Sequence, residues 1–319
     1  MMRIWLAAAL LTACVSAPVG AHAPPRDLRA LIAEARSEAR TGDSVWAGFS
    51  ASPAGVLLVE AERETLFCHD GPASEFWAAG RDGVTGCAMR QRARVFPPNL
   101  LASFPALDGQ PTIVIGTPEA TGQSHDSWLI TLLHERFHQM QDASPGHAAA
   151  VAALDLAGGD QTGMWMLNYP FPYQQGETAA AFAVLARAGV AVLDAQGAER
   201  GAALRAYIEA REAARASVSA ADWRYFEFQA WKEGVARWTQ IAIGRRARSP
   251  AIRALAETQH GEIRTRLAAL DLAAAGRVAF YAIGAAEAEM LERAGPDWRG
   301  AYFDHLALGP LLQRAARQG

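Results

Sequence analysis

The stretch TLLHERFHQM, residues 131–140, places two histidines and a glutamate in a segment that otherwise has the apolar pattern of a core-facing helix. The surrounding run, residues 126–142, is helical by pattern. His134 and His138 are therefore one turn apart, and a step of four residues along an α-helix returns to within about 40° of the same direction. Both imidazoles can point at one ion.

The spacing His-Glu-x-x-His supplies two neutral nitrogen ligands and leaves the carboxylate of Glu135 on the flank. A carboxylate that lies close to a zinc ion without binding it can take a proton from water that the ion acidifies. In a chain of this composition, chance would produce the pattern with a probability on the order of one in a hundred. The alternative is that both histidines are core residues that donate to backbone carbonyls. It would require three polar side chains to be buried among apolar neighbours, each with its own hydrogen-bond partner. The motif predicts zinc-dependent hydrolysis.

These residues resemble the active-site helix of the zincin metallopeptidases. The resemblance implies a helix beneath the edge strand of a small sheet, along which an extended peptide aligns. The stretch QPTIVIGTP, residues 110–118, precedes the helix and is the expected edge strand. Arg136 departs from the uncharged residues that this family prefers between the glutamate and the second histidine.

A catalytic zinc ion normally has three protein ligands and one open position. Residues 225–244 are apolar on nearly every helical face, which is typical of a buried helix, and Glu233 lies in the middle of them. The segment WKEGVARW also resembles the Glu-Gly-x-Ala segment of glutamate-type zincins, the gluzincins, in which this glutamate is the third ligand. Two alternatives stay open: an ion pair between Glu233 and Arg237, and Glu177 as the rival ligand, although Glu177 falls in the first turn of a helix, where acidic residues are common.

The resemblance also implies a Tyr or His that stabilises the oxyanion of the transition state. Tyr281 and His305 are candidates, and each could instead be structural. The aromatic segment MWMLNYPFPY, residues 164–173, could line a substrate pocket or cover the core. His147 fits no ligand spacing and is expected at the surface or as a cap.

The patterns along the chain predict an α+β fold that is mostly helical. After a first helix that stops near Gly42, the short runs VWAGF, GVLLVEA, ETLFC and PTIVIGTP predict a small, mostly antiparallel sheet. Long alanine-rich helical patterns follow. We expect one zincin-like domain over residues 24–319, with the first helix and the sheet in 24–123 and a helical body carrying the metal site in 124–319.

The first 23 residues are typical of an export signal, because Arg3 is followed by an apolar run too short to span a bilayer. The sequence Leu-Thr-Ala-Cys, ending at Cys14, resembles a bacterial lipobox, in which the cysteine is lipidated. Ordinary cleavage after Ala21 or Ala23 is the alternative. Either route places the protein in the cell envelope, as a lipoprotein held to the membrane only through Cys14 or as a free periplasmic protein.

The cysteines and the net charge indicate an oxidising compartment and argue against binding of nucleic acid. Once Cys14 is set aside, Cys68 and Cys87 form an even pair in an oxidising compartment, so we expect a disulfide, with two separate buried thiols as the alternative. The 319-residue chain is long enough for a substantial hydrophobic core. Its formal net charge of −3 provides no basic surface of the kind that attracts nucleic acid.

The predicted function is a zinc-dependent hydrolase of the bacterial envelope, a metallopeptidase with peptide or protein substrates. One alternative is a non-catalytic, lipid-anchored scaffold or binding module on a zincin fold, which Arg136 and the long separation between His138 and Glu233 would favour. A further alternative is a zinc amidase that acts on peptidoglycan or another envelope polymer.

Overall fold

The computed structural model describes residues 26–295 and 297–318. The expected export signal and the lipidation at Cys14 lie outside these residues. Of these described residues, 58% are helical and 12% lie in strands, with a mixed sheet followed by a mostly helical body, so the expected fold class is confirmed. The packing of the backbone divides the chain into two compact units, which are described separately.

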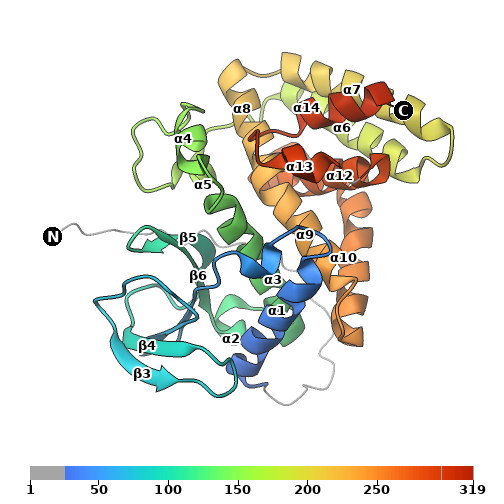
Figure 1. Ribbon diagram of the computed structural model, residues 1–319. Helices are drawn as coiled ribbons and strands as arrows, with labels where there is room; N and C mark the ends of the chain where they lie inside the picture. Colours follow the sequence, from blue (N-terminus) through green and yellow to red (C-terminus); the bar gives the residue numbers. More distant parts are fainter. Residues whose placement is uncertain (1–25, 296, 319) are drawn as a thin grey trace. The chain divides into compact units, whose positions relative to one another are not determined.

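Of the described residues, the first unit contains 26–43 together with Gly48–Met140. In chain order its elements are α1 (Leu28–Gly42), η1 (Phe49–Ala51), β1 (Val56–Val59), β2 (Arg63–Phe67), β3 (Trp77–Arg81), β4 (Ala88–Ala93), β5 (Leu101–Leu107), β6 (Gln110–Gly116), α2 (Pro118–Thr121) and most of α3 (His125–Asp142). The strands described here form one six-stranded sheet in the order β3-β4-β2-β1-β6-β5 (Figure 1). All pairs are antiparallel except β1 with β6, so the expectation of a mostly antiparallel sheet is confirmed.

The expectation that residues 110–118 form the edge strand is wrong. β6 pairs with β1 on one side and with β5 on the other, so β5 takes the edge. A two-residue turn at Asp108 and Gly109, with φ of 46° and 76°, joins β5 to β6; this left-handed backbone suits a tight hairpin. Pro105 lies in β5 where the register shifts between Phe104 and Leu107, and an edge strand tolerates its missing N–H.

The strand expected over the run VWAGF, residues 45–49, is also wrong. This segment forms turns, and Gly48 has a φ of 80° that an extended strand does not adopt. Ser44–Ala47 belongs to the second unit, where the indole Nε1 of Trp46 donates to Thr239 Oγ1 at 2.8 Å. Val45, Trp46 and Phe49 of this run are buried by tertiary packing, which a strand-like pattern cannot distinguish from pairing in a sheet.

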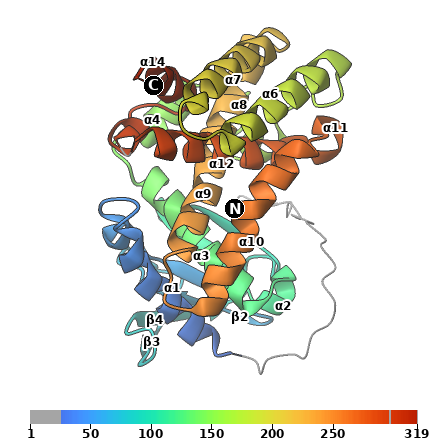
Figure 2. The same cartoon turned by 90° about the vertical axis from the view of Figure 1, so that its right-hand side faces the viewer.

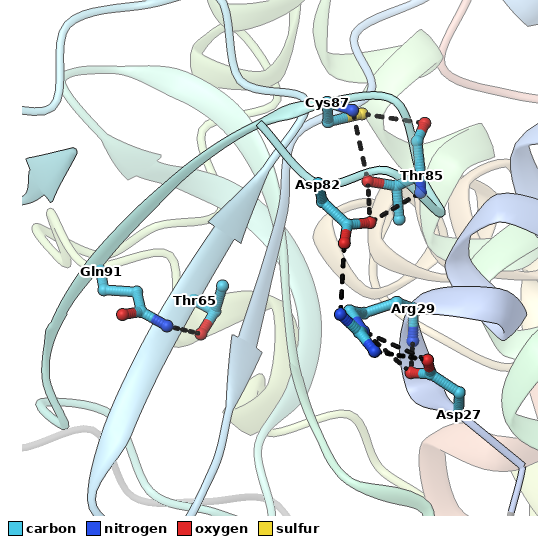
Figure 3. Close-up of polar contacts among 7 residues, drawn as sticks. All are labelled: Asp27, Arg29, Thr65, Asp82, Thr85, Cys87 and Gln91. Carbon is cyan, nitrogen blue, oxygen red and sulfur yellow. Dashed lines mark hydrogen bonds and ion pairs between the residues drawn. The ribbon is translucent and has the colours of Figure 1, made fainter. Parts of the chain in front are cut away.

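A network of hydrogen bonds connects α1 to the turn between β3 and β4 (Figure 3). Asp27 caps α1 by accepting from Arg29 N at 2.9 Å, and Arg29 Nη1 contacts Asp82 Oδ1 at 3.4 Å. Asp82 in turn accepts from the backbone and hydroxyl of Thr85 at 2.6 and 2.8 Å. This turn presents Cys87, whose disulfide with Cys68 confirms the expected pairing.

Replacing both Cys68 and Cys87 by Ser should lower the free energy of unfolding by about 3 kcal/mol, because a covalent loop of this length restricts the unfolded chain. The two cysteines are 19 residues apart. Urea unfolding followed by circular dichroism measures the change, with wild type in reducing buffer as the matched comparison. Equal midpoints for the variant and oxidised wild type would contradict the expectation.

The second unit contains Ser44–Ala47 and the residues from Gln141 onward. Its elements are α4 (His147–Ala152), α5 (Trp165–Asn168), α6 (Gly176–Asp194), α7 (Glu199–Ala216), α8 (Ala220–Gln229), the π-helical segment η2 (Ala230–Gly234), α9 (Val235–Gly244), α10 (Pro250–Ala268), α11 (Leu272–Ala275), η3 (Gly276–Val278), α12 (Ala279–Ala294), α13 (Trp298–Tyr302) and α14 (Gly309–Gln318). The strongly buried α12 packs against η2, α9, α10 and α6 and forms the centre of this unit (Figure 2).

Among the described helices, α6 alone is long and apolar enough to cross a membrane by length and composition, with a mean hydropathy of 1.5. It carries Arg187 within the helix and ends at Asp194. α6 also packs against α7, α10 and α12, and 33% of its apolar window is buried.

Candidate metal centre

Helix α3 presents its two histidines to one another. Ser124 Oγ accepts from Ser127 N at 3.1 Å at the start of the helix, an interaction typical of a helix N-terminus. His134 and His138 are both buried, and their ring centroids lie 4.7 Å apart with the planes at 85°. Their Nε2 atoms approach to 3.1 Å. The Nε2 atoms of the two rings therefore point toward one common position.

This distance fits chelation of a metal ion. Two imidazole nitrogens bound to a tetrahedral zinc ion at about 2.0–2.1 Å lie about 3.3 Å apart, close to the 3.1 Å between the two Nε2 atoms. The same distance suits a hydrogen bond in which one Nε2 carries a proton. Binding a cation requires both nitrogens to be unprotonated, so metal binding would displace that proton.

Two side chains on another face of α3 fix the rotation of the helix in the first unit. Trp128 Nε1 donates to Gly116 O at 2.8 Å, at the end of β6. Gln139 Nε2 donates to Gly55 O at 2.9 Å and to Pro111 O at 3.2 Å. Trp128 and Gln139 are three turns apart and so lie on one face, turned away from the histidines.

Arg136, which departs from the zincin pattern, has a structural role in the first unit. Its guanidinium donates to three backbone carbonyls, of Phe49 at 3.3 Å, Ser50 at 2.8 Å and Ser52 at 3.0 Å. Burial lowers its pKa to about 10, so it remains charged at neutral pH. Two residues from His134 on a helix, it points to nearly the opposite side. Glu135, between the two, is only 5% exposed.

Glu233 lies in the π-helical segment η2 of the second unit, between α8 and α9. Short π-segments inside α-helices are frequent at functional sites. A Cβ on Gly234 would lie 2.4 Å from Gly284 Cα, and a Cβ on Gly284 would lie 2.3 Å from Ala230 O. The backbones of η2 and α12 therefore touch next to Glu233 in the chain, and only glycine fits at these two positions.

Polar side chains of the second unit surround the Glu233 carboxylate. Arg277 Nη1 lies 3.8 Å from Glu233 Oε1 and donates to the hydroxyl of Tyr281 at 2.7 Å and to Gln229 Oε1 at 3.3 Å. Burial, together with the charge of Glu233 and a hydrogen bond to it, raises the pKa of Tyr281 well above its ordinary value. The phenol therefore stays protonated. Sequence reasoning singled out Tyr281 but missed Gln229 and Arg277, which carry no motif.

The last residues of α3 belong to the second unit and contact η2. Gln141 Nε2 donates to Lys232 O at 3.1 Å, next to Glu233 in the chain, and Lys232 Nζ pairs with Asp142 Oδ1 at 2.9 Å. His147, expected at the surface or as a cap, lies half-buried here, with its Nε2 3.3 Å from Asp142. Within the second unit, the last residues of α3 are thus attached to η2.

The aromatic segment 164–173 packs on the core of the second unit. Met166 O accepts from Tyr225 Oη at 2.8 Å and from Gln229 Nε2 at 2.9 Å. Tyr169 stacks on Tyr225 at 4.3 Å, and Phe171 is buried against Phe280 at 5.0 Å. Of the two roles considered for this segment, covering the core agrees with these contacts.

His134, His138 and Glu233 each offer one ligand atom, and these atoms lie within 4.8 Å of one another. Within residues 26–295 and 297–318, no other group of at least three His, Cys, Asp or Glu residues meets that condition. This buried group could hold a metal ion. Glu177 is exposed in the first turn of α6 and His305 is exposed after α13, and neither belongs to the group.

A Gly284→Ala substitution should lower the free energy of unfolding by about 1–3 kcal/mol, the usual cost of overpacking, because the new methyl group meets the backbone of η2. It should also weaken metal binding, since Glu233 must shift with that backbone. Gly261→Ala is the matched control: Gly261 lies in the interior of α10 with no atom within 4 Å of its Cβ position, so alanine there should stabilise the helix. Equal stability and zinc affinity in both variants would contradict this account.

No protein-family model matches the chain, and no curated protein or solved structure matches it.

Proposed function

We propose that this protein is a zinc-dependent hydrolase in which His134, His138 and Glu233 hold the ion. The observation that carries the proposal is the approach of three ligand atoms to within 4.8 Å of one another. Two imidazole nitrogens and one carboxylate form a donor set typical of catalytic zinc, in which a fourth position stays open. A structural zinc site would instead be closed by a fourth protein ligand.

A zinc ion bound there would polarise a substrate carbonyl and acidify water. Glu135, which adjoins a ligand on α3, would accept the proton of the attacking water and pass it to the leaving amine. Tyr281 donates a hydrogen bond to Glu233 and would orient that carboxylate or stabilise the developing oxyanion. These roles describe hydrolysis of an amide bond, and we propose peptides or proteins as the substrates.

The proposed location is the bacterial envelope. Its basis is the N-terminal sequence, with an apolar run and the Leu-Thr-Ala-Cys segment that ends at Cys14. The disulfide between Cys68 and Cys87 supports the same location, because such bonds persist in oxidising compartments.

Zinc content tests the ligand set directly. Wild type should bind one zinc ion per chain. Glu233→Ala and His138→Ala should each weaken zinc affinity by more than about 100-fold, which is more than the loss caused by mutating a residue that only contacts a ligand. Glu177→Ala is the matched control and should bind zinc as wild type does. Chelator competition measures the affinities. A zinc-free wild type, or a Glu233→Ala variant that binds zinc normally, would refute the proposal.

A further inference from the structure

Arg277 uses only part of its guanidinium for the groups around Glu233. Its side chain is 12% exposed, and the contacts described above, with Tyr281, Gln229 and Glu233, all involve Nη1. None of the roles proposed above for hydrolysis involves Arg277. Its placement beside a proposed metal ligand therefore raises the question of what the other two nitrogens bind.

The Nε and Nη2 atoms form the other edge of the guanidinium, and they have no acceptor among residues 26–295 and 297–318. Neither atom is among the described side-chain nitrogens that are fully buried and lack a hydrogen-bond partner. Since both lack an acceptor, neither is fully buried, so this edge of the guanidinium is accessible. The buried Arg211, by contrast, uses Nε, Nη1 and Nη2 for carboxylate oxygens. Arg277 thus differs in leaving an accessible pair of donors unused.

An Nε–Nη2 edge has the geometry that binds both oxygens of a carboxylate. The chain itself provides an example in Arg264, whose Nε and Nη2 each contact one oxygen of Asp194 at 2.7 Å. The carboxylate nearest Arg277 is Glu233, which the proposed function assigns to the metal ion. The Nε–Nη2 edge is then open to a carboxylate from outside the chain.

We propose that Arg277 binds a carboxylate of the substrate through Nε and Nη2, and that this group is the free C-terminus of a peptide. The inference rests on the proposed function, because it assigns Glu233 to the metal ion. The 3.8 Å between Arg277 Nη1 and Glu233 Oε1 is about the length of one residue of extended chain. The carboxylate binds the other edge of the guanidinium, which adds a few ångströms, so cleavage removes a short segment of about one to three residues from the C-terminus.

The test compares N-acetylated tripeptides that end in Ala, Leu or Phe, each as the free acid and as the C-terminal amide. Calorimetry measures their binding to the zinc-loaded Glu135→Gln protein. The acids should bind at least about 30-fold more tightly than the amides, the factor expected for a partly desolvated charge pair. Adding Arg277→Met should reduce that ratio to about one, whereas Arg277→Lys should retain part of it. Arg264→Met is the matched control and should retain the full ratio.

Equal binding of acids and amides to the Glu135→Gln protein would overturn the proposal, and this result needs no variant of Arg277 to fold. A preference for acids that survives Arg277→Met would overturn it as well. Failure of the proposed function has a different signature, because wild type would then bind no zinc. The ratio of acid to amide binding, measured on the zinc-free protein, would still decide whether Arg277 recognises a carboxylate.

Discussion

The Glu135→Gln variant is expected to lose peptide hydrolysis by about 10²–10⁴-fold in kcat, the usual contribution of a general base, while its zinc content stays that of wild type. Glutamine matches the shape of the 5%-exposed glutamate but cannot accept a proton at neutral pH. Initial rates on a peptide library, with and without a chelator, give the change in kcat. Glu177→Gln, on the exposed first turn of α6, is the control and should keep the wild-type rate.

Retained activity in Glu135→Gln would end the proposed mechanism. The same measurements separate the alternative functions. A wild-type protein that binds zinc and cleaves no peptide, but releases fragments from peptidoglycan, would be an envelope amidase. One that binds zinc and hydrolyses neither substrate would be a scaffold or binding module.

The Arg211→Met variant is expected to lose about 3–5 kcal/mol of the free energy of unfolding, because removing one partner of a buried ion pair leaves uncompensated charge. Arg211 contacts both oxygens of Glu227 at 2.8 and 2.7 Å and, through Nε, Glu287 at 2.8 Å. Glu227 also accepts from the backbone N–H groups of Leu308 and Gly309, at 3.1 and 3.3 Å. The cluster thus attaches the chain after α13 to α7 and α8. Denaturant unfolding measures the loss.

The pH dependence of this loss follows from the two carboxyl groups. Burial alone would raise the pKa of Glu227, but the Arg211 guanidinium and the two N–H groups outweigh it, so the pKa is lowered. Because the pKa of Glu227 is lower in the folded chain than its unfolded value, near 4.5, the ionised carboxylate stabilises the fold at pH values above 4.5. This stabilisation is lost as the pH falls through the pKa of the folded state. Burial raises the pKa of Glu287, which has only one contact to Arg211 and leaves Oε2 without a partner among the described residues.

Without Arg211 both carboxyl groups can be buried only with a proton, so the destabilisation should be smaller at pH 5 than at pH 8. Arg215→Met is the matched control, because Arg215 lies one turn further along α7 with its side chain 61% exposed. An exposed pair of this kind contributes about 0–1 kcal/mol. A loss in Arg211→Met no larger than in Arg215→Met would show that the cluster does not stabilise the fold.

The elements that the sequence predicted correctly are those whose pattern is local. The period of the apolar residues located α1 and α3, and continuous apolar runs located β1 and β2. β3 and β4 were missed because their sequences, WAAGR and AMRQRA, have no apolar alternation and their residues are mostly exposed or half-buried. These strands form through hydrogen bonds to a neighbouring strand, as Thr65 and Gln91 show by pairing across β2 and β4 (Figure 3). Strand order was missed for the same reason.

The sequence by itself determined the pair of histidines, because a four-residue spacing on one helix sets the direction of both rings through local hydrogen bonding alone. Only the tertiary structure decided which distant carboxylate joins them: Glu233, not Glu177, belongs to the group. Glu233 lies in the π-helical segment η2, next to the close contact between Gly234 and Gly284. Arg277 likewise reaches Glu233 only after α12 has packed against η2, since contacts between distant segments follow from packing and have no signature in local spacing.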